Sequence, residues 1–313
     1  MSPPEIEPFS DAHLDDAARL LAARHERHRA AEPRLPSDLD LRALVDELWT
    51  KEGRSGAVGV RDARVTSYLI GTPKDEAEWG LNVWIELAGH AAEEPEDVRD
   101  LYAHAAAGWI SDGRRSHYVF VPASEHELVD AWFRLGFGAQ QAHGIIDVPD
   151  SEWPDAVREA EEADVDALVA LAPALNVHQQ QSPVFSSPRR WTDDDVRASI
   201  VEDLERDDIA TLVVERDGRI VGNFVVCPVE LSSMHSGLAR PPGASYLAFA
   251  VTDPGARGSG AGVALTEASF AWARAHGYET MVTDWRVTNL LASRFWPRRG
   301  FRPTFLRLHR FVS

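Results

Sequence analysis

A glycine-rich segment, DPGARGSGAG at residues 253–262, has the residue types that bind a diphosphate. It follows an apolar run and precedes a stretch whose apolar residues recur with helical spacing. A glycine-rich turn that enters a helix presents unpaired backbone N–H groups and the positive end of the helix dipole. Gly258, Gly260 and Gly262 lack Cβ atoms, so an anion can approach the backbone closely. The segment therefore predicts a pyrophosphate-binding loop.

Two widespread phosphate loops do not fit this segment. A Walker loop needs GxxxxGK[ST], and residues 253–262 contain no lysine. A Rossmann fingerprint needs GxGxxG and an acidic residue at the end of a following strand, whereas this segment reads GxGxG and lacks that residue. The loop is thus a diphosphate loop of another kind.

The elements around the loop predict an α/β sandwich. Periodicity, capping residues and turn residues indicate the order ααββ-β-α-β-α-β in this half of the chain. The predicted elements are a helix at Asp164–Ala174, a polar loop at Asn176–Trp191, a helix at Asp193–Glu205 capped by Thr192, hairpin strands at Ala210–Glu215 and Ile220–Val226, a doubly buried strand at Ser245–Val251, a helix at Ser259–His276 ended by Gly277, a strand at Glu279–Trp285, a helix at Asn289–Trp296 and a strand at Phe305–Phe311.

The chain repeats part of this pattern. Residues 128–137 read LVDAWFRLGF and residues 292–301 read ASRFWPRRGF, and residues 11–21 resemble residues 161–171. With 313 residues, the chain has the length of about two domains. The Pro- and acid-rich segment at 147–155 is the natural linker. We therefore predict domains at residues 1–148 and 155–313.

The second half resembles the GNAT N-acetyltransferase superfamily. The family signature, Arg or Gln, two residues, Gly, one residue, then Gly or Ala, matches Arg257, Gly260 and Gly262. A Val-x-x-Pro variant stands before it at Val251 and Pro254, and a later module runs from Asn289 to a Gly-Phe pair. The resemblance covers about 150 residues with three motifs in order. It implies two tandem GNAT-like domains, each a mixed, mostly antiparallel sheet flanked by helices.

The resemblance implies acetyl-CoA as the acyl donor, and no metal. The loop amides would bind the pyrophosphate, and the strand before the loop would hydrogen-bond the pantetheine arm, in a register uncertain by one residue. A backbone N–H near Ala250 would polarise the thioester carbonyl. Asn289 would contact the cofactor arm, or serve only as a helix N-cap. The implied donor-binding residues are Ala250, Val251, Thr252, Arg257, Gly258, Ser259, Gly260, Ala261, Gly262 and Asn289.

Acetyl transfer requires a neutral amine, so a base is expected. Asp284 and Glu230 are the candidate catalytic bases, with the loop histidines at 178 and 235 behind them, and no spacing singles one out. The family's usual acid is a tyrosine, but Trp296 stands at that position and its indole does not release a proton. A thiolate of pKa near 8.5 is a fair leaving group without an acid. Trp296 and His178 are candidate acceptor-binding residues, and Trp296 is alternatively a core aromatic.

The first copy keeps the Gly-Phe ending but not the loop. Its equivalent region, residues 82–100, has one glycine, Gly89, and six carboxylates. Acidic side chains at a helix N-terminus would repel a pyrophosphate. We predict a degenerate GNAT-like domain that binds no CoA and either completes the acceptor site or stabilises its partner.

Composition narrows the function further. A net charge of −18 disfavours nucleic acid as a partner, no apolar run is long enough for a membrane span, and nothing marks the N-terminus for secretion. With a single cysteine, Cys227, these features favour the cytoplasm. We predict an N-acetyltransferase acting on a small-molecule amine. A protein acceptor and a non-catalytic acyl-CoA sensor or structural protein are the alternatives, and the sequence leaves the acceptor, the acyl chain and the oligomeric state open.

Overall fold

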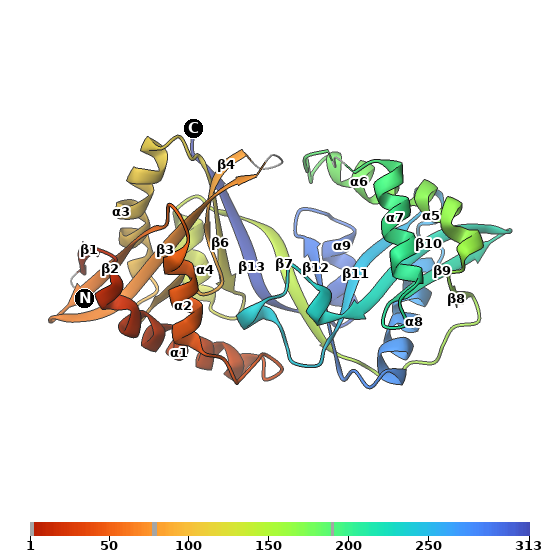
Figure 1. Ribbon diagram of the computed structural model, residues 1–313, viewed down its shortest axis with the longest axis horizontal. Helices are drawn as coiled ribbons and strands as arrows, with labels where there is room; N and C mark the ends of the chain where they lie inside the picture. The colour runs from red at the N-terminus through yellow and green to blue at the C-terminus, as the bar shows by residue number, and fades with distance from the viewer. Residues whose placement is uncertain (1–2, 77–79, 189–190) are drawn as a thin grey trace. The chain divides into compact units, whose positions relative to one another are not determined.

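The computed structural model describes residues 3–76, 80–188 and 191–313, which form two compact units (Figure 1). The first unit contains the chain up to His143 together with Gly237–Arg240 and Pro303–Ser313. The second contains Gly144–Ser236 and Pro241–Arg302. Each unit is a sheet flanked by helices, with mostly antiparallel pairing, and this confirms the predicted α/β fold class.

The first unit is built on the strand order β1-β2-β3-β4-β6-β13, and among the pairings of its described residues only that of β4 with β6 is parallel. Its strands are β1 (Glu5–Pro8), β2 (Ser55–Arg61), β3 (Arg64–Glu76), β4 (Gly80–Ile85), β5 (His90–Ala92), which pairs with β3, β6 (Ser116–Pro122) and β13 (Arg302–Phe311). Its helices are α1 (Leu14–Ala31), α2 (Leu41–Thr50), α3 (Asp97–Ser111) and α4 (His126–Arg134).

Both faces of this sheet are buried by helices. Successive side chains of a strand point to opposite faces. Accordingly, Leu69 and Val83 belong to the core formed with α3 and α4. Tyr68 and Ile70 belong instead to the core formed with α1 and α2.

The second unit repeats this plan with the strand order β7-β12-β11-β10-β9-β8. Its strands are the part of β7 (Gly138–Asp147) from Gly144 on, β8 (Val157–Glu159), β9 (Ala210–Arg216), β10 (Arg219–Pro228), β11 (Ser245–Thr252) and β12 (Thr280–Arg286). Its helices are α5 (Val165–Leu171), α6 (Pro173–Gln180), α7 (Asp193–Leu204), α8 (Ala261–Ala275) and α9 (Ala292–Arg298).

The two faces of the second sheet carry different helices. On one face, a side chain at Gly222 would collide with Leu265 of α8, so α8 packs directly on the backbone of β10. Cys227, Tyr246 and Val282 form a core cluster on the other face. In Figure 1, α8 lies on one side of this sheet and α5 and α7 lie on the other.

The two sequence copies exchange strands. β13, at the end of the chain, pairs with β6 of the first unit from Phe305 opposite Pro122 to Phe311 opposite Ser116. The residues of β7 from Gly144 on belong to the second unit, next to β12. The compact units are therefore not linear segments. The division into residues 1–148 and 155–313 stays a prediction about the two copies in the sequence.

Local sequence signals explain most element boundaries. Thr192 caps α7 in a capping box with Asp195, as its position predicted. Gly277, at φ +81°, follows α8, and the amide of the next residue bonds back to Ala273 in a Schellman motif. The polar loop predicted from Asn176 was wrong at its start, since α6 begins at Pro173 and continues to Gln180. Proline is well suited to the first turn of a helix.

Candidate acyl-CoA site

β11 and β12 separate soon after they meet. They pair in parallel only at Ser245 opposite Met281 and Tyr246 opposite Val282. The hydroxyl of Thr283 then donates to the carbonyl of Leu247 at 3.0 Å, and within the described part of the chain no further pairing joins the two strands. β11 nevertheless continues to Thr252 along β10. Its last residues therefore have one edge without a strand partner.

The pairing with β10 decides which backbone groups face that open edge. Val225 lies opposite Phe249 and Val226 opposite Leu247, so Ala248 is the extra residue of a β-bulge. Beyond the bulge, the amide of Asp253 donates to Val221 of β10 at 2.8 Å. Because hydrogen-bonding directions alternate along a strand, Val251 also faces β10.

Ala250 and Thr252 consequently direct their N–H and C=O groups to the open edge. Which residues would pair with a pantetheine arm stays a prediction. The burial predicted for both faces of this strand was wrong here, because Ala248 is exposed and Ala250 is only half-buried.

The glycine-rich loop ends in a helix terminus with free donors. Gly260 is the N-cap of α8 at φ +89°, in the left-handed region, and no side chain caps the helix. The amides from Gly260 to Val263 have no hydrogen-bond partner in the part of the chain that the structure describes. Gly258 is also left-handed, at φ +76°. A Cβ at either glycine would meet no described atom of the protein within 4 Å, so the space in front of these amides is open.

Two arginines belong to this loop region. Arg257 is exposed within the loop, as the sequence motif predicted. Arg216, at the end of β9, donates a hydrogen bond to the carbonyl of Ser259. Both guanidinium groups suit a phosphate. Sequence reasoning missed Arg216 because a hairpin strand brings it to the loop from far away in the sequence.

Asn289 and His178 are brought together. The side-chain oxygen of Asn289 accepts hydrogen bonds from the amides of Leu291 at 3.1 Å and Ala292 at 3.3 Å, so the residue does cap the turn that leads into α9. The same oxygen lies 3.2 Å from Nε2 of His178 on α6. The side-chain nitrogen of Asn289 bonds to no described residue, which leaves it available as a donor.

Asp284 lies just beyond the point where β11 and β12 separate. The hydroxyl of Tyr246 donates to Oδ1 of Asp284 at 3.0 Å. Burial, followed by the charge of Asp284, raises the pKa of Tyr246, so its hydroxyl stays protonated and acts as a donor. Burial also raises the pKa of the neighbouring Cys227 thiol to about 12. A protonated, buried thiol is not a nucleophile.

Glu230 occupies the other end of the strand. It is exposed in a short 3-10 turn that follows Pro228, and Pro228 lies opposite Ser245, the first residue of β11. At roughly 3.3 Å per residue, Ala250 is about 16 Å further along the strand. The geometry therefore favours Asp284 over Glu230 as a base near the open edge.

Trp296 is a core residue. It is 5% exposed, and its ring lies 5.0 Å from that of Phe295, 5.4 Å from that of Phe301 and 6.0 Å from that of Phe224. This position favours the structural alternative for Trp296 over contact with an acceptor.

The first unit has no open edge at the equivalent strands, as far as its described residues show. β4 pairs with β6 from Asn82 opposite Ser116 to Ile85 opposite Val119, which is the end of β4. Arg24 of α1, buried in the core, donates to the carbonyls of the segment that follows, at Leu87 and His90. Nε2 of His90 in turn lies 2.9 Å from the carbonyl of Phe120. In the first unit, side chains thus fill the space that corresponds to the open edge of β11 in the second unit.

The equivalent helix terminus is also occupied. Asp97, the first residue of α3, forms two hydrogen bonds of 2.5 and 2.6 Å with Arg61 and is buried. Glu94 and Glu96 precede it in the sequence. This terminus is therefore satisfied internally and surrounded by negative charge.

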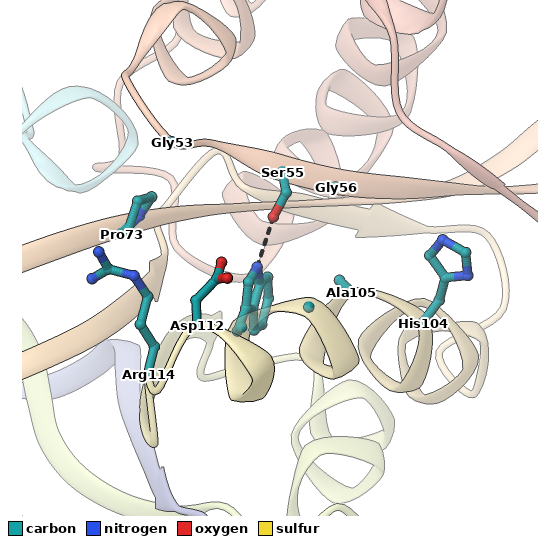
Figure 2. A pocket seen from close by; sticks show the side chains of 10 residues that line it. Gly53, Ser55, Gly56, Pro73, His104, Ala105, Asp112 and Arg114 are labelled. Atoms are coloured by element: carbon teal, nitrogen blue, oxygen red, sulfur yellow. Dashed lines mark hydrogen bonds between the residues drawn. The ribbon is translucent and has the colours of Figure 1, made fainter.

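A hollow of about 240 Å³ in the first unit lies elsewhere (Figure 2). It is bounded by the start of β2 and by the C-terminal half of α3, where the indole of Trp109 donates to Ser55 at 2.7 Å. Arg114, which points toward it in Figure 2, is bonded to Asp75 at 2.6 Å. The charge of this arginine is therefore already paired with a carboxylate, and the hollow does not adjoin the N-terminus of α3.

Within residues 3–76, 80–188 and 191–313, no cluster of three His, Cys, Asp or Glu side chains is arranged to hold a metal ion. Over the same residues, no helix is long and apolar enough to cross a membrane.

The comparisons with known proteins agree with this geometry. A family model described as the acetyltransferase (GNAT) family matches residues 174–301, which include β11, the loop, α8 and Asn289. This part of the chain belongs to the GNAT family. A search of the curated proteins found no match.

Solved GNAT structures share the fold over nearly the whole chain. A GCN5-related N-acetyltransferase from Sphaerobacter thermophilus superposes with a TM-score of 0.61 at 15% identity, covering 99% of this chain and 97% of that one. A tandem GNAT protein from the clavulanic acid biosynthesis pathway gives a TM-score of 0.50 at 15% identity, covering 99% of both chains. A fungal glucosamine N-acetyltransferase region gives 0.56 at 13% identity, covering 99% of this chain and 38% of that one. The predicted tandem GNAT fold is confirmed.

Proposed function

We propose that the protein is an N-acetyltransferase that transfers the acetyl group of acetyl-CoA to the amine of a small molecule. The open edge of β11, which leads directly to the unpaired amides of α8, is the observation that carries the proposal. Acetyl-CoA has the complementary chemistry, since a diphosphate is joined to an extended arm that contains two amide groups. The GNAT family of residues 174–301 supports the same reaction class.

The donor would be held from the loop to the strand. The amides from Gly260 to Val263, with Arg257 and Arg216, would bind the diphosphate. Ala250 and Thr252 would pair with the arm as a further strand would. The free amide nitrogen of Asn289 would donate to the same arm. Val251, whose backbone faces β10, would contribute through its side chain only.

The transfer itself needs one base and one oxyanion donor. The ammonium acceptor must first lose a proton, which at pH 7 costs roughly 4–5 kcal/mol for an amine of ordinary pKa, and the carboxylate of Asp284 would accept that proton. The nitrogen then attacks the thioester carbon, and the N–H of Ala250 stabilises the oxyanion. Collapse breaks the C–S bond. The thiolate leaves and takes the second proton of the nitrogen, so no acid is needed at Trp296.

The acceptor would lie beside α6, where His178 contacts Asn289 at the end of the donor site. A net charge of −18 would concentrate cationic amines near the surface. The first unit, with its closed strand pair and its acidic helix terminus, would bind no CoA. We therefore expect one donor site per chain.

Two measurements test the proposal. Calorimetry with CoA should show one site per chain, and the absence of binding would refute the donor site. Incubation with acetyl-CoA and a panel of small amines should release free thiol in an amine-dependent manner. Tight CoA binding without turnover on any amine would instead support the acyl-CoA sensor, for which the missing tyrosine at Trp296 is the motivating observation.

A further inference from the structure

The contact between Tyr246 and Asp284 joins two strands at the point where they separate. Tyr246 is the last residue of β11 that pairs with β12, and Asp284 stands two residues beyond the pairing on the same face as Val282. Tyr246 is 8% exposed, whereas Asp284 is half-buried. The phenol is thus a buried support for a carboxylate that reaches the open part of the site.

The donor in this hydrogen bond is Tyr246. An ionised carboxylate only accepts hydrogen bonds, so the single hydrogen of the Tyr246 hydroxyl is committed to Asp284. The ring of His235 packs against the ring of Tyr246, with 5.0 Å between the centroids, and so fixes the phenol in place.

A buried turn holds Ser232 in place. Its oxygen accepts from the amides of Met234 at 3.2 Å and His235 at 3.1 Å. Nδ1 of His235 lies 3.1 Å from the same oxygen. Ser232 therefore links the ring of His235 to the backbone of the turn. Ser232 is 4% exposed and His235 is 1% exposed, so these contacts are shielded from water.

We propose that Tyr246 is a positioning residue that holds the carboxylate of Asp284 in the orientation that a base needs, and that Ser232 and His235 fix Tyr246 for this role. The contacts run from Ser232 through the rings of His235 and Tyr246 to the carboxylate. The inference rests on the proposed function, because Asp284 is assigned there as the base.

The groups around Asp284 bear on the pH dependence of the reaction rate. Tyr246 faces it from β11, and Cys227 from β10 lies in the same cluster. The ring of His235 lies 5.0 Å from that of Tyr246. Arg286 follows on the same face of β12. Removal of the Tyr246 hydroxyl deprives the carboxylate of its hydrogen-bond donor on β11.

The test compares Tyr246→Phe with Tyr278→Phe in the full chain. Tyr278 is a matched control in the same unit, since its ring stacks on Trp272 at 5.9 Å and its hydroxyl forms no hydrogen bond with a described residue. With one amine substrate, Y246F should lower kcat tenfold or more. It should move the acidic limb of the pH–rate profile upward by about one unit, the equivalent of one charge-assisted hydrogen bond. Y278F should change neither, and the Kd for CoA should stay constant in both.

A double-mutant cycle separates positioning from general damage. If Tyr246 acts through Asp284, then Y246F combined with Asp284→Asn should be no slower than D284N alone. Multiplying defects, or an unshifted pH profile in Y246F, would overturn the inference while leaving acetyl transfer intact. Ser232→Ala should give a smaller upward shift of the same limb, and it serves as the test if Y246F does not fold. An inactive wild type that binds CoA would instead refute the proposed transfer.

Discussion

The left-handed N-cap of α8 offers a sharp test of the donor site. Gly260→Ala places a Cβ at φ +89°, which costs about 1–2 kcal/mol in the folded state for a residue with a side chain. That Cβ meets no described protein atom within 4 Å, so no further loss of stability is expected. It does project into the space where a diphosphate must approach. Loss of one charge-assisted hydrogen bond costs about 1.5–3 kcal/mol, equivalent to a roughly ten- to hundredfold higher Kd for CoA.

Gly243→Ala is the matched control. Gly243 belongs to the same unit and has φ +60°, and a Cβ at this position would likewise have no described atom within 4 Å. Both variants should therefore unfold at similarly lower denaturant concentrations. Only G260A should show weakened CoA binding by calorimetry. Equal Kd values for wild type, G243A and G260A would refute the assignment of the α8 terminus to the diphosphate.

Two further predictions concern the first unit. Arg61→Leu leaves the buried carboxylate of Asp97 without its partner and should lower the free energy of unfolding in urea by about 3–5 kcal/mol. The Kd for CoA should be unchanged at a temperature where the variant stays folded. A loss of stability below about 1 kcal/mol would contradict the role of this pair. Burial lowers the pKa of both His28 and His90 to about 3. In the unfolded chain these side chains titrate near 6.5, so below that pH the unfolded state binds more protons than the folded state. The free energy of unfolding is therefore unaffected by these histidines above about pH 6.5, and it falls as the pH decreases toward 3. At pH 5 the free energy of unfolding should be lower than at pH 8 by roughly 2 kcal/mol for each histidine. Urea unfolding of wild type and His90→Gln at both pH values checks this, since the variant should lose less stability between pH 8 and pH 5.

Local signals in the sequence were sufficient to place the glycine-rich loop and the helix that follows it. The glycines, the helical stripe of α8 and the terminating Gly277 are dictated by backbone conformation, so a short window of sequence contains their cause. The expected N-cap role of Asn289 followed from its place before a helix for the same reason. Its bond to His178 could not be predicted, because the two residues meet only when α6 folds over the sheet.

Contacts between distant strands were beyond the reach of sequence patterns. Asp284 and Glu230 were equivalent as carboxylates near strand ends, and only the register of β11 with β10 and β12 separated them. Tyr246 lacked any local signature of its bond to Asp284. The exchange of β7 and β13 was equally hidden, since either strand satisfies the alternation that a sheet position requires.

That exchange has a consequence for how the chain is made. β6 emerges from the ribosome long before β13, its partner in the first unit. Until β13 arrives, the edge of β6 exposes unpaired backbone groups, and such edges invite pairing with other chains. Domains that fold one after another during synthesis avoid this delay, whereas here the first unit must wait until the strands of the second have been made. Premature termination near residue 300 would therefore damage the half of the protein that was synthesised first.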